Sequence, residues 1–253
     1  MAPSVAIAAR VLDLLAHSTP QAGLTEIARA LRVNKSTCFN VLQTLARFGL
    51  VVRIGDSALY RLGPKLVDLG TAVRRNLSYR AQLREHLGTL AVEAGVGCVV
   101  GQMLGDNSGY VIMDRIAPPV EDGVAPPVGF TYPITAPAIG RAALSCLDEE
   151  EALDLVRRVL GIAAEIDFGR WRRDLAQIRR DGYAVSLEAY RKAVNAVAAP
   201  VRWSGEPLTV IAMVGSAAKL PETSVPEFGA RLRAIARILE SHEFGGQPSP
   251  PEA

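Results

Sequence analysis

The sequence lacks any run of about 20 consecutive apolar residues, the length that a membrane-spanning helix needs. Cysteine is scarce as well, since only 3 of the 253 residues are cysteine and they lie far apart. An odd number of widely spaced cysteines argues against a disulfide framework and fits a reducing cytosol. The first ten residues contain neither the basic stretch nor the apolar run of a secretion signal. We therefore expect a cytoplasmic protein with no membrane partner.

Motifs that carry common enzyme chemistry are also missing. The chain has no H-E-x-x-H, no C-x-x-C, no phosphate-binding P-loop and no G-x-S-x-G elbow. Its three histidines fall in separate predicted helices without paired metal ligands nearby. We expect no catalytic residue, no metal site and no cofactor. A redox role for Cys98 or Cys146 stays open, although their apolar neighbours favour the thiol over the reactive thiolate.

The chain does contain ample apolar material for a folded core, and its charge is unevenly distributed. Hydrophobic residues make up 49% of the sequence and charged residues 21%. Residues 1–75 hold ten basic and four acidic side chains, whereas the rest of the chain holds 18 basic and 22 acidic ones. A basic N-terminal part joined to a larger acidic part indicates a polyanionic partner for the first part alone.

Two helices are predicted before residue 32. Apolar residues recur at i, i+3, i+4 and i+7 along residues 5–18, which is the pattern of a helix with one buried face. Residues 19–23 include proline and glycine and break that helix. Thr25 is a candidate N-cap for a second, short helix that ends at Leu31.

A third helix is predicted over residues 36–48, between a candidate N-cap at Asn34 and Gly49, which ends it. One side of this helix is apolar, and the opposite side carries short polar side chains that can approach DNA closely. Hydroxyl groups near the helix start suit phosphate oxygens, and the Asn40 amide suits a base edge. We predict ten DNA-binding residues in this region and the following hairpin: Thr25, Asn34, Lys35, Ser36, Thr37, Asn40, Thr44, Arg47, Arg53 and Arg61.

A β-hairpin is predicted directly after the third helix. Residues 50–54 and 58–62 are strand-like and flank a Gly-Asp-Ser turn. Arg53 and Arg61 lie on this hairpin, where they can reach the DNA backbone beside the groove. Helices and hairpin in this order predict a winged helix-turn-helix domain over residues 1–63.

A linker helix is predicted over residues 64–78, because Pro64 suits the first position of a helix. A narrow apolar seam runs along it, and the seam either docks on the same chain or pairs with a second copy. We favour pairing, and hence a homodimer or dimer of dimers on a pseudo-palindromic, double-stranded DNA operator. The seam consists of Leu66, Leu69, Val73 and Leu77.

Residues 79–245 predict a second domain of mixed helices and strands, and residues 246–253 a disordered tail. Strands that follow one another, with helices between the runs, indicate an α+β fold with a helix-covered sheet. Strands are expected at 98–104, 110–116, 183–187, 194–199 and 208–215, and helices at 76–94, 148–160, 167–180 and 226–244.

Several ordered segments resemble IclR-type transcriptional regulators. The DNA-binding end of that family is similar to residues 8–15, 23–31, 34–37 and 60–64 of this chain. In the second half, residues 181–184 and 193–201 look like effector-domain signatures, and residues 135–144 are similar to the segment that opens an α-helix beside the ligand pocket. The resemblance runs from about residue 5 to about residue 240.

Membership of this family implies a fold class and a way of working. The fold class is α+β, with an N-terminal winged helix-turn-helix, a pairing linker helix and a C-terminal GAF-like α/β effector-binding domain with a curved antiparallel sheet. Family members bind operators as dimers or dimer pairs, and a small organic effector changes that binding.

The sequence departs from the family pattern at positions that matter for recognition. Members commonly carry arginine where Asn40 stands, so its base preference is open. Small-acid sensors of the family place polar residues at the positions of Ala196, Met213 and Gly215. A carboxylate buried there without donors would cost roughly 1–3 kcal/mol. We therefore expect an effector more apolar than glyoxylate or pyruvate, with an aromatic compound as one candidate, unless Arg141 or Ser186 supplies the donors.

The predicted effector site combines these positions with methionines, which adapt to irregular ligands but also fill ordinary cores. A small-molecule-binding protein without DNA-binding activity is the alternative function. The predicted effector-binding residues are Met103, Met113, Arg115, Ala138, Ile139, Gly140, Arg141, Ser186, Ala196, Met213 and Gly215.

Overall fold

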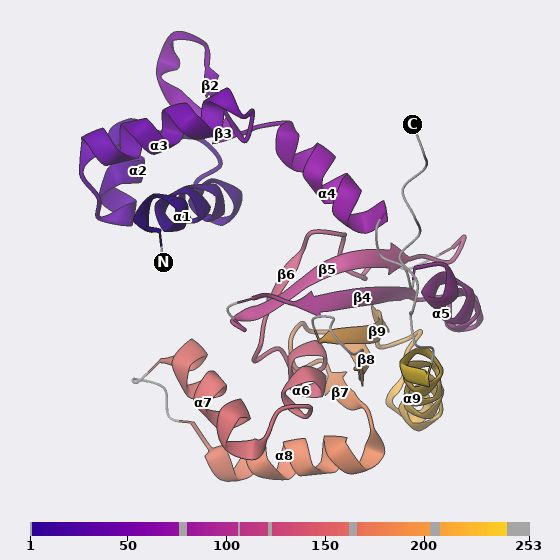
Figure 1. The fold of residues 1–253 in the computed structure, drawn as a ribbon. Coiled ribbons are helices and arrows are strands. Elements are labelled where there is room, and N and C mark those ends of the chain that lie inside the picture. The colour runs from indigo at the N-terminus through magenta and orange to yellow at the C-terminus, as the bar shows by residue number, and fades with distance from the viewer. Residues whose placement is uncertain are drawn as a thin grey trace. The chain divides into compact units, whose positions relative to one another are not determined.

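The computed structural model describes residues 2–75, 80–105, 107–120, 123–161, 166–202 and 208–241, apart from the side chains of Asp56 and Arg80. The chain divides into two compact units, Met1–Leu77 and Ser78–Ala253. Figure 1 shows the elements of both units. Along the described ranges, no helix is long and apolar enough to span a membrane.

The first unit is a winged helix-turn-helix, as predicted. Three helices pack together with a small antiparallel sheet in the order β1-β3-β2. Apolar residues from these three helices and from the sheet are buried between them, among them Val11, Ile27, Leu42 and Val51. The elements are α1 (Pro3–His17), β1 (Ala22–Gly23), α2 (Leu24–Leu31), α3 (Lys35–Arg47), β2 (Val51–Ile54), the 3-10 turn η1 (Gly55–Ser57), β3 (Leu59–Leu62) and α4 (Lys65–Arg75).

The helix boundaries confirm one predicted cap and correct another. Asn34 caps α3, because its side-chain oxygen accepts a hydrogen bond from the Thr37 backbone N–H at 2.7 Å. Thr25 was predicted to be the N-cap of α2, and this prediction is wrong. Gly23, whose backbone is extended, stands at that position, and Thr25 lies within the first turn. The two-residue strand β1 fixes this start through its pairing with Leu59 and Tyr60.

The linker helix α4 has an exposed apolar seam within the first unit. None of its residues is buried, and the side chains of Leu69 and Val73 are 45% and 51% exposed. Leu66 is half-buried, and Leu77 lies outside the described residues.

The second unit is built on a six-stranded antiparallel sheet in the order β6-β5-β4-β9-β8-β7. A β-bulge at Val100/Gly101 shifts the register between β4 and β5. The elements are α5 (Arg80–Ala94), β4 (Gly97–Met103), β5 (Gly109–Ile116), β6 (Thr131–Pro133), α6 (Ile139–Leu144), α7 (Glu149–Leu160), α8 (Phe168–Asp181), β7 (Ala184–Leu187), β8 (Val194–Val201), β9 (Thr209–Ser216), η2 (Glu222–Ser224) and α9 (Val225–Ser241).

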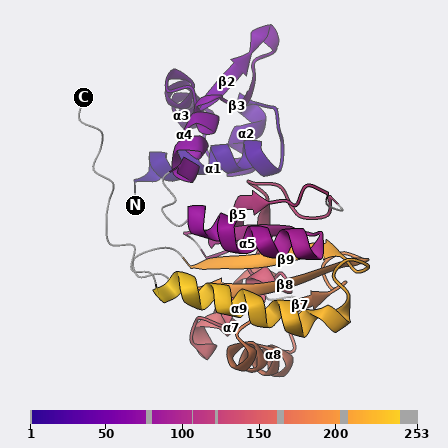
Figure 2. The ribbon, with the colours of Figure 1, turned by 90° about the vertical axis from the view of Figure 1, so that its right-hand side faces the viewer.

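Helices cover both faces of this sheet. Helices α5 and α9 pack side by side on one face, and α6 packs on the other face with α8 beyond it (Figures 1 and 2). Arg84 of α5 donates to Asp114 of β5 at 3.2 Å and fastens that helix to the sheet. The predicted α+β class with an antiparallel sheet is confirmed.

The predicted strands and helices of the second unit lie within a few residues of the observed ones. Strand β6 was not predicted, because three residues are too few to show an alternating pattern. The predicted tail at 246–253 and the first residues of the helix predicted over 76–94 lie outside the described residues.

Candidate DNA-binding surface and effector cavity

Helix α3 presents the predicted polar face to solvent. Its inward residues Cys38, Leu42 and Leu45 are at most 5% exposed. All ten predicted DNA-binding residues have exposed side chains except Thr37, which is half-buried. The fold therefore leaves this face free to meet a duplex.

Hydrogen bonds hold part of this face in place. The Ser36 hydroxyl donates to the Asn34 side-chain oxygen, and the Thr44 hydroxyl donates to the Asn40 carbonyl, both at 2.9 Å. Within the described part of the chain, the side-chain amide of Asn40 has no hydrogen-bond partner. An unengaged amide on an exposed helix face can pair with an adenine edge.

Gln43 belongs to the same face, although it is not among the residues predicted from the sequence to bind DNA. It is exposed, lies one turn after Asn40 and precedes Arg47 by four residues. Helical spacing alone could have identified it, because residues three and four apart lie together on one side.

The wing carries its two arginines on opposite faces. Arg53 pairs with Tyr60, and Arg61 pairs with Val52, in the β2–β3 register. Directly paired residues share a face and successive residues alternate, so the two guanidinium groups point to different sides of the hairpin. Both side chains are exposed.

A groove of about 450 Å³ lies beside the polar face of α3. Thr37, Asn40 and Thr44 form its α3 wall, and Ser4 and Val5 belong to its α1 wall. The start of α1 therefore borders the candidate DNA-binding surface.

The second unit contains a separate cavity of about 280 Å³ on the face of the sheet that α6 covers. We call it the candidate effector cavity. Its walls are the loop that precedes β6, the start of α6, the turn between β7 and β8, and one row of sheet residues. Its 17 lining residues are Gly123, Val124, Ala125, Pro126, Pro127, Phe130, Tyr132, Ala136, Pro137, Ala138, Ile139, Ser186, Tyr190, Arg191, Val194, Ala196 and Val214.

Strand register determines which sheet residues face this cavity. Ser186 pairs with Ala196, and Ala196 pairs with Val214, so the three side chains form one row across β7, β8 and β9. The predicted residues Met213 and Gly215 flank Val214 in β9 and therefore point to the other face. Val214 replaces both in the cavity wall.

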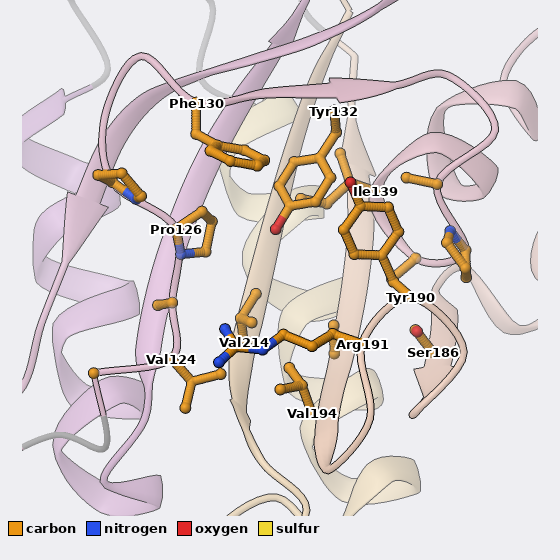
Figure 3. A pocket seen from close by; sticks show the side chains of 17 residues that line it. Val124, Pro126, Phe130, Tyr132, Ile139, Ser186, Tyr190, Arg191, Val194 and Val214 are labelled. Atoms are coloured by element: carbon orange, nitrogen blue, oxygen red, sulfur yellow. The ribbon is translucent and has the colours of Figure 1, made fainter.

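Three aromatic rings form one wall of the cavity. The ring centroids of Phe130 and Tyr132 lie 4.9 Å apart, and those of Tyr132 and Tyr190 lie 5.1 Å apart. Figure 3 shows the three rings beside the open space. Burial, together with the neighbouring Tyr190, raises the pKa of the Tyr132 phenol, which stays a neutral hydrogen-bond donor. This wall suits a flat apolar body.

Two polar side chains point into the same space. Ser186 is 4% exposed, and within the described residues its hydroxyl has no hydrogen-bond partner. Arg191 comes from the β7–β8 turn and extends across the cavity in Figure 3. A hydroxyl and a guanidinium group beside an aromatic wall can bind the polar end of a ligand.

Four of the eleven predicted effector residues line the cavity. These are Ala138, Ile139, Ser186 and Ala196. The other seven do not line it: Met103, Met113, Arg115, Gly140, Arg141, Met213 and Gly215.

Two of those seven have evident packing roles. Arg141 forms an ion pair with Asp174 at 2.9 Å, and its guanidinium group lies 5.0 Å from the ring centre of Trp171. Gly140 lies so close to Ile134 that an added Cβ would come within 2.0 Å of the Ile134 carbonyl oxygen. Arg141 therefore lies outside the cavity and does not supply a hydrogen-bond donor to it, whereas Ser186 is in position to do so.

The aromatic wall and Arg191 were not predicted from the sequence. Phe130 and Tyr132 directly follow the proline-rich segment that the chain uses as a pocket loop, and Tyr190 and Arg191 directly precede the second family signature. Proximity to those segments was the only available signal, because both pairs reach the cavity from loops or edge strands.

Burial also bears on the cysteines. It raises the pKa of the Cys98 thiol to about 12 and raises that of Cys146, despite the nearby Arg202. Both thiols therefore stay protonated at neutral pH, which disfavours a redox role. Among the described side chains, no group of three His, Cys, Asp or Glu residues could hold a metal ion.

Comparison with known proteins gives the same assignment for both units. Residues 71–241 match the family "Bacterial transcriptional regulator IclR C-terminal", and residues 4–55 match the "IclR helix-turn-helix domain". The chain is 25% identical over 244 residues to the transcriptional repressor IclR of Escherichia coli (strain K12), with 94% of this chain and 88% of that protein covered.

Solved structures agree with the sequence matches. An IclR transcriptional regulator from Alicyclobacillus acidocaldarius has a TM-score of 0.78 at 32% identity, over 95% of this chain and 98% of that one. An IclR homolog from Microbacterium hydrocarbonoxydans, complexed with 4-hydroxybenzoate, shares the fold with a TM-score of 0.68 at 21% identity, over 94% and 97% of the two chains.

These matches argue against the alternative of a small-molecule-binding protein without DNA-binding activity, because residues 4–55 match the helix-turn-helix domain of a family of DNA-binding regulators. The exposed polar face of α3 and the cavity of the second unit fit the same assignment. The chain belongs to the IclR family of bacterial transcriptional regulators, which are DNA-binding proteins and not enzymes.

Proposed function

We propose that this regulator binds a pseudo-palindromic operator as a homodimer and that a single-ring organic effector in the candidate effector cavity changes its operator affinity. The observation that carries the effector proposal is the cavity wall of Phe130, Tyr132 and Tyr190, with Ser186 and Arg191 beside it. The DNA part rests on the exposed polar face of α3.

The operator contacts divide into two kinds. Asn40, which is exposed near the middle of α3 with its amide unengaged, reads a base edge in the major groove. Ser36, Lys35 and Arg53 contact phosphates, since hydroxyl and cationic groups near a helix start or on a wing suit that role.

Two substitutions separate these roles in a gel-shift titration on the promoter DNA beside the gene. We expect Asn40→Ala to weaken specific binding roughly tenfold or more and to leave binding to random DNA unchanged. Arg53→Ala should weaken binding to both the specific and the random DNA. It should also reduce the slope of log affinity against log salt concentration by about one. Equal losses on both DNAs for Asn40→Ala would remove Asn40 from base recognition.

The cavity limits the size and chemistry of the effector. Its volume of about 280 Å³ lies near the lower end of the roughly 300–1,000 Å³ typical of ligand pockets, so one ring with a short polar group fits. The IclR homolog that was solved with 4-hydroxybenzoate supports a ligand of this type. An aromatic body buries apolar area against the rings, while Ser186 and Arg191 bind its polar end.

Thermal-shift measurements with three probes test the effector class, because a ligand confined to the native state raises the melting temperature. We expect 4-hydroxybenzoate to raise the Tm more than 4-hydroxybenzamide, and pyruvate to raise it least. In Arg191→Ala the preference for the acid over the amide should disappear, and in Val214→Trp all three shifts should disappear because the cavity is filled. A response to pyruvate alone would contradict the proposal.

A further inference from the structure

A second hollow, of about 590 Å³, lies in the second unit away from the candidate effector cavity. It is lined by residues at the C-terminal ends of α6 and α8, at the end of β8 and in the C-terminal half of α9. Four arginines line it, so we call it the arginine cleft: Arg179, Arg202, Arg233 and Arg237.

Neutral partners hold two of these guanidinium groups in place. Arg179 donates to the carbonyl oxygens of Ser145 and Leu147 at 3.0 and 2.9 Å, and Arg233 donates to the carbonyl oxygen of Asp181 at 3.0 Å. These bonds satisfy the carbonyl groups that end α6 and α8. Because these carbonyl partners carry no full negative charge, they do not offset the positive charge of either arginine, and each guanidinium group has further N–H donors.

Acidic groups do not balance the arginines. The two carboxylates that line the cleft, Asp148 and Glu240, each accept a backbone N–H: from Glu151 for Asp148 and from Arg202 for Glu240, both at 2.8 Å. Within the described residues, the Arg237 side chain has no hydrogen bond or ion pair. Four arginines against two engaged carboxylates leave the cleft with a surplus of positive charge.

We propose that the arginine cleft is a second small-molecule site, which binds a multivalent oxyanion of the phosphate-ester or di- and tricarboxylate class. Arginines of α8 and α9 and Arg202, which directly follows β8, line it together, and their planar guanidinium groups match the paired oxygens of phosphate and carboxylate.

The cleft and the candidate effector cavity share no lining residue, yet two elements connect them. The start of α6 and the start of β8 line the cavity, whereas the segment after α6 and the end of β8 line the cleft. Because the two sites share no lining residue, binding to one site can be measured while the other is empty.

Isothermal titration of the full-length protein at low ionic strength, with pyrophosphate and with citrate as probes, tests the site. We expect one saturable site per chain for at least one probe. Arg237→Gln should weaken it roughly tenfold or more, because it removes a charged hydrogen-bond donor. Arg158→Gln is the matched control, since Arg158 is an exposed arginine of α7 outside the cleft, and it should leave the affinity unchanged.

A second variant tests the charge argument should Arg237→Gln fail to fold. Glu240→Gln keeps the oxygen that accepts from the Arg202 backbone but removes a negative charge, so it should tighten pyrophosphate binding several-fold. The proposal is overturned if neither probe binds at millimolar concentration. It is also overturned if Arg237→Gln and Arg158→Gln weaken binding equally, which would show general attraction to a basic surface.

Discussion

At the residue scale, the side chains on the polar face of α3 limit which base pairs the regulator can recognise. Asn40 and Gln43 are both exposed amides one turn apart. Asparagine and glutamine pair through two hydrogen bonds with the N6 and N7 atoms of adenine, whereas arginine favours guanine. We therefore expect the operator to have an A·T pair at each position that Asn40 or Gln43 contacts.

Gln43→Ala tests this reading. We expect it to weaken operator binding by roughly 5-fold to 100-fold and to relax the base preference at one position, since one bidentate contact contributes about 1–3 kcal/mol of discrimination. Selection of DNA from a randomised half-site pool, for the wild type and the variant, measures the preference. An unchanged base profile would show that Gln43 does not contact a base.

Tyr110 is a residue whose burial has a cost. Its side chain is fully buried, and among the described residues its hydroxyl has no hydrogen-bond partner. Burial raises the pKa of this phenol far above its usual range, so it stays neutral. Such a group costs free energy because it loses its water and gains no bond.

Tyr110→Phe should therefore leave the free energy of unfolding unchanged or raise it by about 1 kcal/mol. Urea unfolding followed by circular dichroism measures the change. A loss of stability well above that amount would show that the hydroxyl is bonded after all, for example to a buried water molecule.

At the element scale, α6 depends on close contact between backbones. Gly140 stands next to the Ile134 carbonyl oxygen, with no room for a Cβ. Five of the six residues of α6 are buried, so the helix cannot shift to make space without disturbing the sheet. Since α6 also begins at the candidate effector cavity, its position determines the shape of that cavity.

Gly140→Ala should lower the free energy of unfolding by about 1–3 kcal/mol through overpacking. Gly88→Ala in α5 is the matched control, because a Cβ there meets nothing within 4 Å. It should raise the stability by roughly 0.5–1 kcal/mol, the usual gain for replacing glycine inside a helix. Equal effects of the two substitutions would disprove the packing argument.

At the scale of the whole molecule, the uneven charge and the exposed seam of α4 belong together. The basic N-terminal part is attracted to DNA, and the proposed pairing of two copies would place two recognition helices on one operator. The side chain of Val73 in the seam is 51% exposed. A second copy of α4 would cover it.

Val73→Asp should weaken self-association and lower operator affinity roughly 100-fold or more, because a monomer loses the gain of two linked contacts. Sedimentation velocity and gel shift measure the two effects. Val92→Asp in α5 is the matched control, since Val92 is 62% exposed and lies outside the seam. Pairing through α4 would be refuted by a Val73→Asp protein that stays dimeric.

Local patterns in the sequence determined most elements of both units, but not the short strands β1 and β6, and they determined the polar face of α3. Helical periodicity, the Asn34 cap and the hairpin turn each depend on neighbouring residues alone, so they can be read without the fold. The Thr25 cap failed because the two-residue strand β1, which forms only by pairing with β3, starts α2 earlier.

The set of residues that line the candidate effector cavity was decided by the tertiary structure. A shift of one residue along a strand changes the face of the sheet, so Val214 lines the cavity and its neighbours Met213 and Gly215 do not. Tyr132 and Arg191 reach the same space from distant parts of the chain. Such convergence depends on strand register and on the course of loops, and no short-range pattern in a single sequence encodes it.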